Sequence, residues 1–145
     1  MLKKKLIIVV LTLVLSLTGV TSAFAYEGWA DTKATAYQLQ APILGVSSLL
    51  DSPYDTDWYS WTNNTGVSRS FSAKLVSPAG KIYGFSIILP GGGSPSYYYD
   101  STPGGFVKVS TTVTIAPGAT VYFQVRGNTF DQFSTTEPYN FTVLY

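Results

Sequence analysis

The chain has 145 residues, of which nine are lysine or arginine and eight are aspartate or glutamate, and it contains neither histidine nor cysteine. These absences exclude Ser-His-Asp and Cys-His nucleophilic catalysis, and they remove the ligands of the usual zinc sites. No disulfide can form, so the fold depends on its apolar core, and a chain of this length is long enough to bury one in a single domain.

Residues 1–25 are typical of an export signal. A lysine triplet at 3–5 precedes an apolar run over 6–17, and the segment ends with Ala-Phe-Ala at 23–25. This order of a basic head, an apolar middle and small residues predicts cleavage after Ala25. The apolar run is shorter than the roughly 20 residues of a spanning helix. We therefore expect a secreted, extracellular product that keeps no membrane anchor.

Cleavage of the signal would change the charge of the protein. The signal carries three of the nine basic residues, so the mature chain keeps six basic residues against eight acidic ones, a net charge of −2. A slightly acidic domain with scattered cations has no electrostatic footprint for nucleic acid and no basic cluster for an anionic membrane surface. We expect neither partner. An exported chain without cysteine also indicates a bacterial rather than an animal protein.

The mature sequence indicates an all-β domain. Residues 26–42 are irregular and predict an N-terminal arm or a lead-in strand, whereas 43–145 alternate apolar and polar residues between Pro/Gly turns. Strands with one apolar face must cover each other, which predicts an antiparallel two-sheet β-sandwich. We expect a polar loop over 128–138. About eight strands are expected, near 43–50, 57–63, 68–77, 80–89, 96–100, 106–116, 119–127 and 138–145.

Three aspartates, Asp51, Asp55 and Asp57, stand within seven positions at the entrance of an expected strand. Calcium takes several carboxylate and carbonyl oxygens, so these residues are a candidate calcium site. The alternative is that they bond nearby backbone amides in a turn that includes Pro53. No EF-hand glycine or closing glutamate follows them. Apart from calcium, we expect no cofactor.

A tyrosine triplet, Tyr97, Tyr98 and Tyr99, is the second candidate site. On a strand, Tyr97 and Tyr99 share one face and Tyr98 takes the other. Exposed aromatic rings stack on sugar rings or on apolar partner side chains with little entropic loss, so these tyrosines and Trp58 are candidate ligand-binding residues. The alternative is that one face of this strand belongs to the core and the other is an ordinary outer face.

Residues 55–66, Asp-Thr-Asp-Trp-Tyr-Ser-Trp-Thr-Asn-Asn-Thr-Gly, resemble the Asp-x-Asp-x-Tyr-x-aromatic segment and glycine turn of bacterial pre-peptidase C-terminal (PPC) domains. Residues 116–127 and 139–143 are similar to the family's Gly-x-Tyr-aromatic-x-Val strand and its closing strand, and 77–80 match a Pro/Gly turn. Such domains are small β-sandwiches appended to exported enzymes. The resemblance implies a jelly-roll or PPC-like fold with a role in secretion, folding or surface binding. The insert 91–99, with the tyrosine triplet, departs from the pattern.

No pair of carboxylates stands in a recognisable catalytic context, and no phosphate-binding or dinucleotide motif is present. We therefore expect no enzyme. The sequence favours a secreted, non-catalytic β-sandwich module that binds an extracellular polymer or surface, namely a polysaccharide, a cell wall or a protein. The alternative is a structural or matrix protein that self-associates through exposed strands, because edge strands with few charges favour such pairing.

Overall fold

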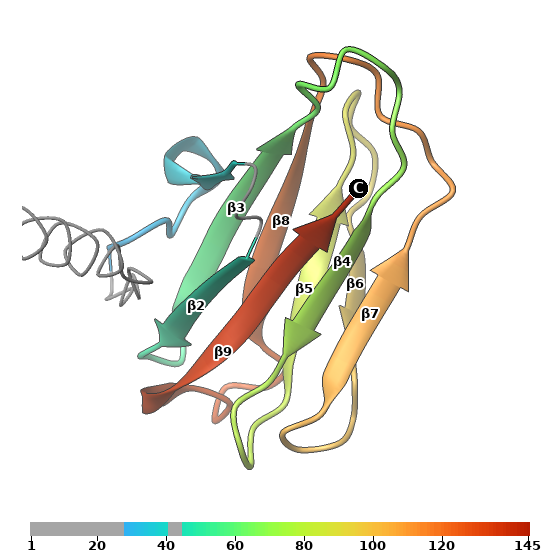
Figure 1. The fold of residues 1–145 in the computed structure, drawn as a ribbon. Helices are drawn as coiled ribbons and strands as arrows, with labels where there is room; N and C mark the ends of the chain where they lie inside the picture. Colours follow the sequence, from blue (N-terminus) through green and yellow to red (C-terminus); the bar gives the residue numbers. More distant parts are fainter. Residues whose placement is uncertain (1–27, 41–44) are drawn as a thin grey trace, which may run out of the picture.

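The computed structural model describes residues 28–40 and 45–145. The predicted signal, 1–25, lies outside the described residues. Within the described ranges no helix is long and apolar enough to cross a membrane. The elements, drawn in Figure 1, are η1 (Lys33–Thr35), β1 (Tyr37–Leu39), β2 (Gly45–Leu50), β3 (Thr56–Thr62), β4 (Ser72–Val76), β5 (Tyr83–Ile88), β6 (Ser96–Tyr99), β7 (Phe106–Ser110), β8 (Thr120–Gly127) and β9 (Ser134–Leu144).

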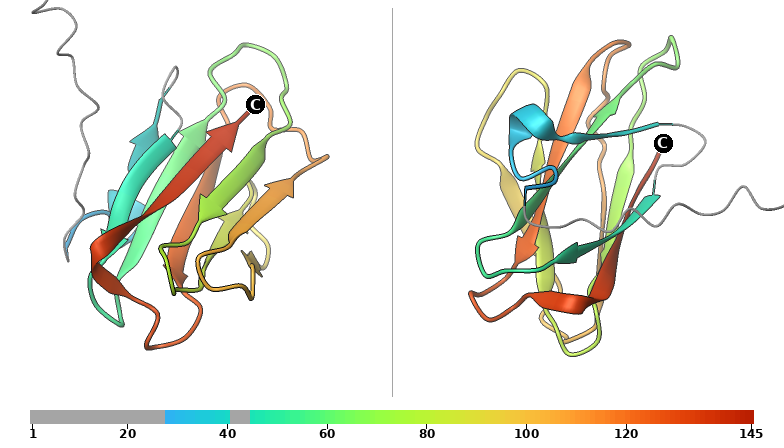
Figure 2. Two further views of the ribbon diagram at one scale, coloured as in Figure 1. Left: turned by 60° about the horizontal axis from the view of Figure 1, so that its bottom comes forward. Right: turned by 90° about the vertical axis from the view of Figure 1, so that its left-hand side faces the viewer.

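The strands form two stacked sheets (Figures 1 and 2). One sheet has the order β1-β3-β8-β5-β6 and the other the order β2-β9-β4-β7. Every pairing between these strands is antiparallel except that of β1 with β3, which is parallel. The predicted two-sheet β-sandwich is confirmed. The strand beyond the expected eight is β1, which comes from the irregular segment before residue 43.

The core lies between the sheets and is built from alternate residues of the strands. Phe71, Ala73 and Leu75 are buried, as their alternation with polar residues predicts. At the centre, the ring of Phe141 stacks on Tyr59 with 5.2 Å between ring centroids and meets Phe85 edge-on at 5.4 Å. Because the chain has no cysteine, these aromatic contacts and the apolar area around them hold the sheets together.

Two of the expected strands, β4 and β7, are about half as long as predicted. β4 and β7 cover only part of 68–77 and 106–116, and outside them the two segments share an isolated bridge between Arg69 and Ile115. The hydroxyl of Thr111 accepts a hydrogen bond from the backbone N–H of Val113 at 2.9 Å. Such a local bond competes with the strand ladder, and Val113, in the expected strand 106–116, is exposed.

The expectation of a loop over the whole of 128–138 is wrong, because β9 begins at Ser134. Ser134 pairs with Leu50, beyond an irregularity in the register between Ser48 and Leu50. The early residues of β9 are polar and exposed, so their own sequence has no apolar alternation. A partner strand that is distant in sequence, rather than a local pattern, extends β9.

Candidate functional site

The three tyrosines of β6 divide between the two faces of the five-stranded sheet. Tyr98 points inward and packs against Phe85 of the core, with 5.9 Å between the ring centroids. Tyr97 and Tyr99 lie on the outer face, where their rings stack at 5.8 Å and 29°. The structure thus separates Tyr98 from the outer pair, and Tyr99 remains 49% exposed.

The ring of Tyr97 is fixed in place by two neighbours. It lies against Gly84 on β5, and a Cβ atom at position 84 would collide with its hydroxyl end. The guanidinium of Arg126 lies 4.2 Å from the ring centroid, a cation–π distance. The Tyr97 hydroxyl is buried without a hydrogen-bond partner among the described residues, and this burial raises its pKa. The ring is therefore held along the sheet surface.

Trp58 shares the outer face with Tyr97 but does not touch it. The register places Trp58 opposite Gln124 of β8, Gln124 opposite Ser86 of β5, and Ser86 opposite Tyr97 of β6. Three strand spacings separate the two aromatic residues, about 14 Å. Nearby, η1 lies outside the same sheet (Figure 2, right), with the Nζ atom of Lys33 4.6 Å from the Tyr122 ring centroid.

The predicted aspartates lie at the end of the sandwich where β3 begins. Asp57 is fully buried, and one of its oxygens, Oδ2, accepts hydrogen bonds from the hydroxyls of Tyr139 and Tyr59. Asp55 accepts a bond from the backbone N–H of Asp51 at 2.9 Å. Burial raises the pKa of Asp57 to about 7 and that of Asp55 to about 6.

These contacts bear on the calcium hypothesis in two ways. The Oδ1 atoms of Asp55 and Asp57 and the hydroxyl of Tyr83 are buried without hydrogen-bond partners in the part of the chain that the structure describes. Unsatisfied buried oxygens of this kind suit a hard cation. However, no three acidic side chains among the described residues are grouped closely enough to hold one metal ion. Calcium binding by Asp51, Asp55 and Asp57 stays a prediction.

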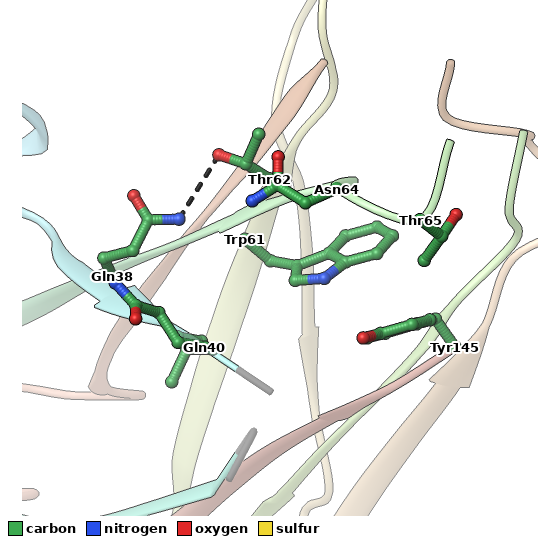
Figure 3. A pocket seen from close by; sticks show the side chains of 8 residues that line it. Gln38, Gln40, Trp61, Thr62, Asn64, Thr65 and Tyr145 are labelled. Carbon is green, nitrogen blue, oxygen red and sulfur yellow. Dashed lines mark hydrogen bonds between the residues drawn. The ribbon is translucent and has the colours of Figure 1, made fainter. Parts of the chain in front are cut away.

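A cavity of about 500 Å³ lies at the other end of β3 (Figure 3). Trp61 is at its centre and stacks on Tyr145, with 5.0 Å between ring centroids. Trp61 is 2% exposed and so belongs to the core, and nothing in the sequence indicated the cavity beside it. The lining residues come from β1 and the residue after it, from the end of β3 and the turn after it, and from residue 145: Gln38, Leu39, Gln40, Trp61, Thr62, Asn64, Thr65 and Tyr145. No local sequence pattern links these positions.

Comparison with known proteins identifies the fold. No protein-family model matches the sequence, and no curated protein matches it. The PPC domain of a collagenase from Bacillus anthracis matches with a TM-score of 0.52 and 14% identity, over 75% of this chain and 92% of that one. CorA, a surface-associated copper-binding protein of Methylomicrobium album BG8, matches with a TM-score of 0.50 and 8% identity, over 75% of this chain and 96% of that one. Likeness at such identities concerns the fold alone. The chain has a β-sandwich fold like that of pre-peptidase C-terminal domains.

Proposed function

We propose that the protein is a secreted, non-catalytic module that binds an extracellular polymer or surface, such as a polysaccharide, a cell wall or a protein. The outer face of the five-stranded sheet is the binding surface. The observation that carries this proposal is the stacked pair Tyr97 and Tyr99, which lies along the sheet beside the guanidinium of Arg126.

This surface suits a flat or extended ligand. Tyrosine rings offer a large contact area with few rotatable bonds, and the Tyr97 ring is already fixed by Gly84 and Arg126, so little conformational entropy is lost on binding. Arginine adds donors for hydroxyl or carbonyl oxygens at the edge of the aromatic pair. Trp58, about 14 Å away in the same cross-strand row, offers a second contact to a ligand long enough to span the strands between.

The position of the buried carboxylates supports a role without catalysis. Asp57 has the most strongly raised carboxyl pKa, a property that often marks catalytic groups. Yet its side chain is fully buried and faces the hydroxyls of Tyr59 and Tyr139, so it has no access to a substrate. A structural role in the core explains its environment.

Binding of the protein to insoluble bacterial cell wall and to insoluble polysaccharides tests the proposal. Tyr99→Ala and Trp58→Ala are expected to lower the bound fraction several-fold without changing the melting temperature. Tyr54→Ala is the matched control, because Tyr54 is an aromatic residue that is 81% exposed in the loop between β2 and β3. Equal binding by the wild type and both sheet-face variants would contradict the proposal.

Self-association is the second candidate function, and a groove favours it. A cavity of about 290 Å³ lies where the edge strands β6 and β7 of the two sheets approach each other. Its lining includes Phe71, Leu89, Tyr98 and Val113. Edge strands beside a groove that contains apolar side chains can pair with another copy of the chain. Light scattering after size-exclusion chromatography tests this: mass should rise with protein concentration, and Val113→Lys should prevent the rise.

A further inference from the structure

The cavity around Trp61 is remote from the tyrosine pair. It adjoins β1, whereas Tyr97 and Tyr99 are on β6, and these two strands are the opposite edges of the same sheet. Binding at the cavity and binding at the sheet face are therefore separable properties. The cavity lies within the range of about 300–1,000 Å³ that is usual for small-molecule sites.

The side chains that line the cavity are neutral, as far as the described residues go. Gln38, Gln40 and Asn64 bring side-chain amides, and Thr62 and Thr65 bring hydroxyls. An amide both donates and accepts hydrogen bonds, which is the pairing that a sugar hydroxyl requires. A charged ligand would find no counter-charge on these side chains, so the lining favours an uncharged, hydroxyl-rich molecule.

The turn that presents Asn64 and Thr65 is rigid because of its buried neighbour Asn63. The Asn63 amide nitrogen donates to the carbonyl oxygens of Val67 at 2.8 Å and Ile115 at 2.7 Å. Its oxygen accepts from the backbone N–H of Thr65 at 3.1 Å and from the Thr65 hydroxyl at 2.7 Å. Three of these bonds lie within the turn and the fourth ties it to Ile115, so Asn63 fixes the backbone that carries the two lining residues.

The aromatic part of the cavity has a buried half and an open half. Trp61 is 2% exposed, whereas Tyr145, stacked on it at 27°, is 44% exposed. The indole supports one side of the tyrosine ring and leaves the ring otherwise accessible (Figure 3). Across Trp61 from Tyr145 (Figure 3), the amide nitrogen of Gln38 donates a hydrogen bond to the Thr62 hydroxyl at 3.3 Å. An aromatic ring beside several amides and hydroxyls is the arrangement with which proteins bind the apolar face and polar rim of a pyranose.

We propose that this cavity is a second binding site, which takes a neutral sugar unit, with the Tyr145 ring against its apolar face and the amides of Gln38 and Asn64 on its hydroxyls. The site does not depend on the sheet-face function proposed above.

Nuclear magnetic resonance titration of the ¹⁵N-labelled protein tests the site with named probes. These are the neutral trisaccharides cellotriose, maltotriose and N,N′,N″-triacetylchitotriose, with trigalacturonate as the anionic counterpart. At least one neutral probe is expected to shift the Trp61 indole and the Asn64 side-chain amide signals. Asn64→Ala combined with Gln38→Ala should weaken that binding about tenfold or more. Asn140→Ala, on an exposed amide of β9, should have no effect.

Two results would overturn the inference: no shift at Trp61 and Asn64 with any neutral probe, or a shift that only trigalacturonate causes. The sheet-face variant Tyr99→Ala separates the two proposals. It should leave the shifts at Trp61 intact, whatever its effect on adhesion to insoluble polymers. If Tyr99→Ala abolishes the shifts at Trp61, the cavity is not an independent site and the inference is wrong.

Discussion

Tyr139 of β9 donates a hydrogen bond to the carboxylate of Asp57 on β3, so a buried polar contact joins the two sheets across the apolar core. Tyr59, from the same strand as Asp57, donates to the same oxygen. Both hydroxyls and the carboxyl group are fully removed from solvent. The stability of the sandwich therefore depends on the protonation state of Asp57.

Stability is expected to fall as the pH rises from about 4 to about 7. Burial raises the pKa of Asp57 from 3.8 to about 7, so in this range the unfolded chain releases a proton that the folded chain retains. Unfolding is thus favoured by rising pH, and above pH 7 both states are ionised and the loss is complete. A shift of this size corresponds to at most roughly 4 kcal/mol. Urea denaturation at a series of pH values, with a chelator present, measures the effect.

Asp57→Asn is the matching variant, because an amide of the same shape cannot ionise. It should remove most of the decrease and be more stable than the wild type at pH 8. The remaining decrease in stability with rising pH comes from Asp55, because burial raises the pKa of its carboxyl group to about 6. A wild-type stability that increases between pH 4 and pH 7 would contradict this account.

Tyr139→Phe is expected to destabilise the protein by about 1.5–3 kcal/mol at pH 8, because it removes a hydrogen bond to a charged, buried group. Tyr83→Phe is the matched control. Its hydroxyl is also buried in the core but has no hydrogen-bond partner among the residues that the structure describes, so its loss should be neutral or slightly stabilising. Thermal unfolding of both variants at pH 8 makes the comparison. Equal losses would mean that the Tyr139 hydroxyl contributes no specific bond.

Gly84→Ala is expected to destabilise the sandwich by about 1–3 kcal/mol, because the added methyl group collides with the Tyr97 ring and the backbone of Tyr98. The same change should cost less in a Tyr97→Ala background, where one of the two obstacles is gone. Denaturant unfolding of the single and double variants measures this coupling. If Gly84→Ala destabilises the protein equally in both backgrounds, the added methyl group collides only with the backbone of Tyr98.

Local alternation explains why much of the fold could be predicted from the sequence. Val121, Phe123 and Val125 occupy alternate positions of the expected strand 119–127, and all three are buried in β8. The same rule assigned Tyr97 and Tyr99 to one side and Tyr98 to the other, as the structure has them. An alternating pattern indicates the face on which a residue lies, because successive side chains of a strand point to opposite faces of the sheet.

The rest of the fold depends on partners that are distant in sequence. β1 has only three residues, too few for an alternating pattern to distinguish a strand from an arm, and its pairing with β3 defines it as a strand. The role of Gly84 follows only from the register of β5 with β6. The cavity joins Gln38, Asn64 and Tyr145, which only the folded topology brings together.

Calcium titration is the remaining test of the aspartates. If Asp51, Asp55 and Asp57 bind calcium, isothermal titration of the wild type should show heat, and Asp55→Ala should show none. A bound cation would also favour the ionised carboxylates and so lower their pKa values. The decrease in stability between pH 4 and pH 7 should then become smaller when calcium replaces the chelator. If the wild type gives no heat and calcium leaves the pH dependence unchanged, the buried carboxylates have a purely structural role beside Tyr59 and Tyr139.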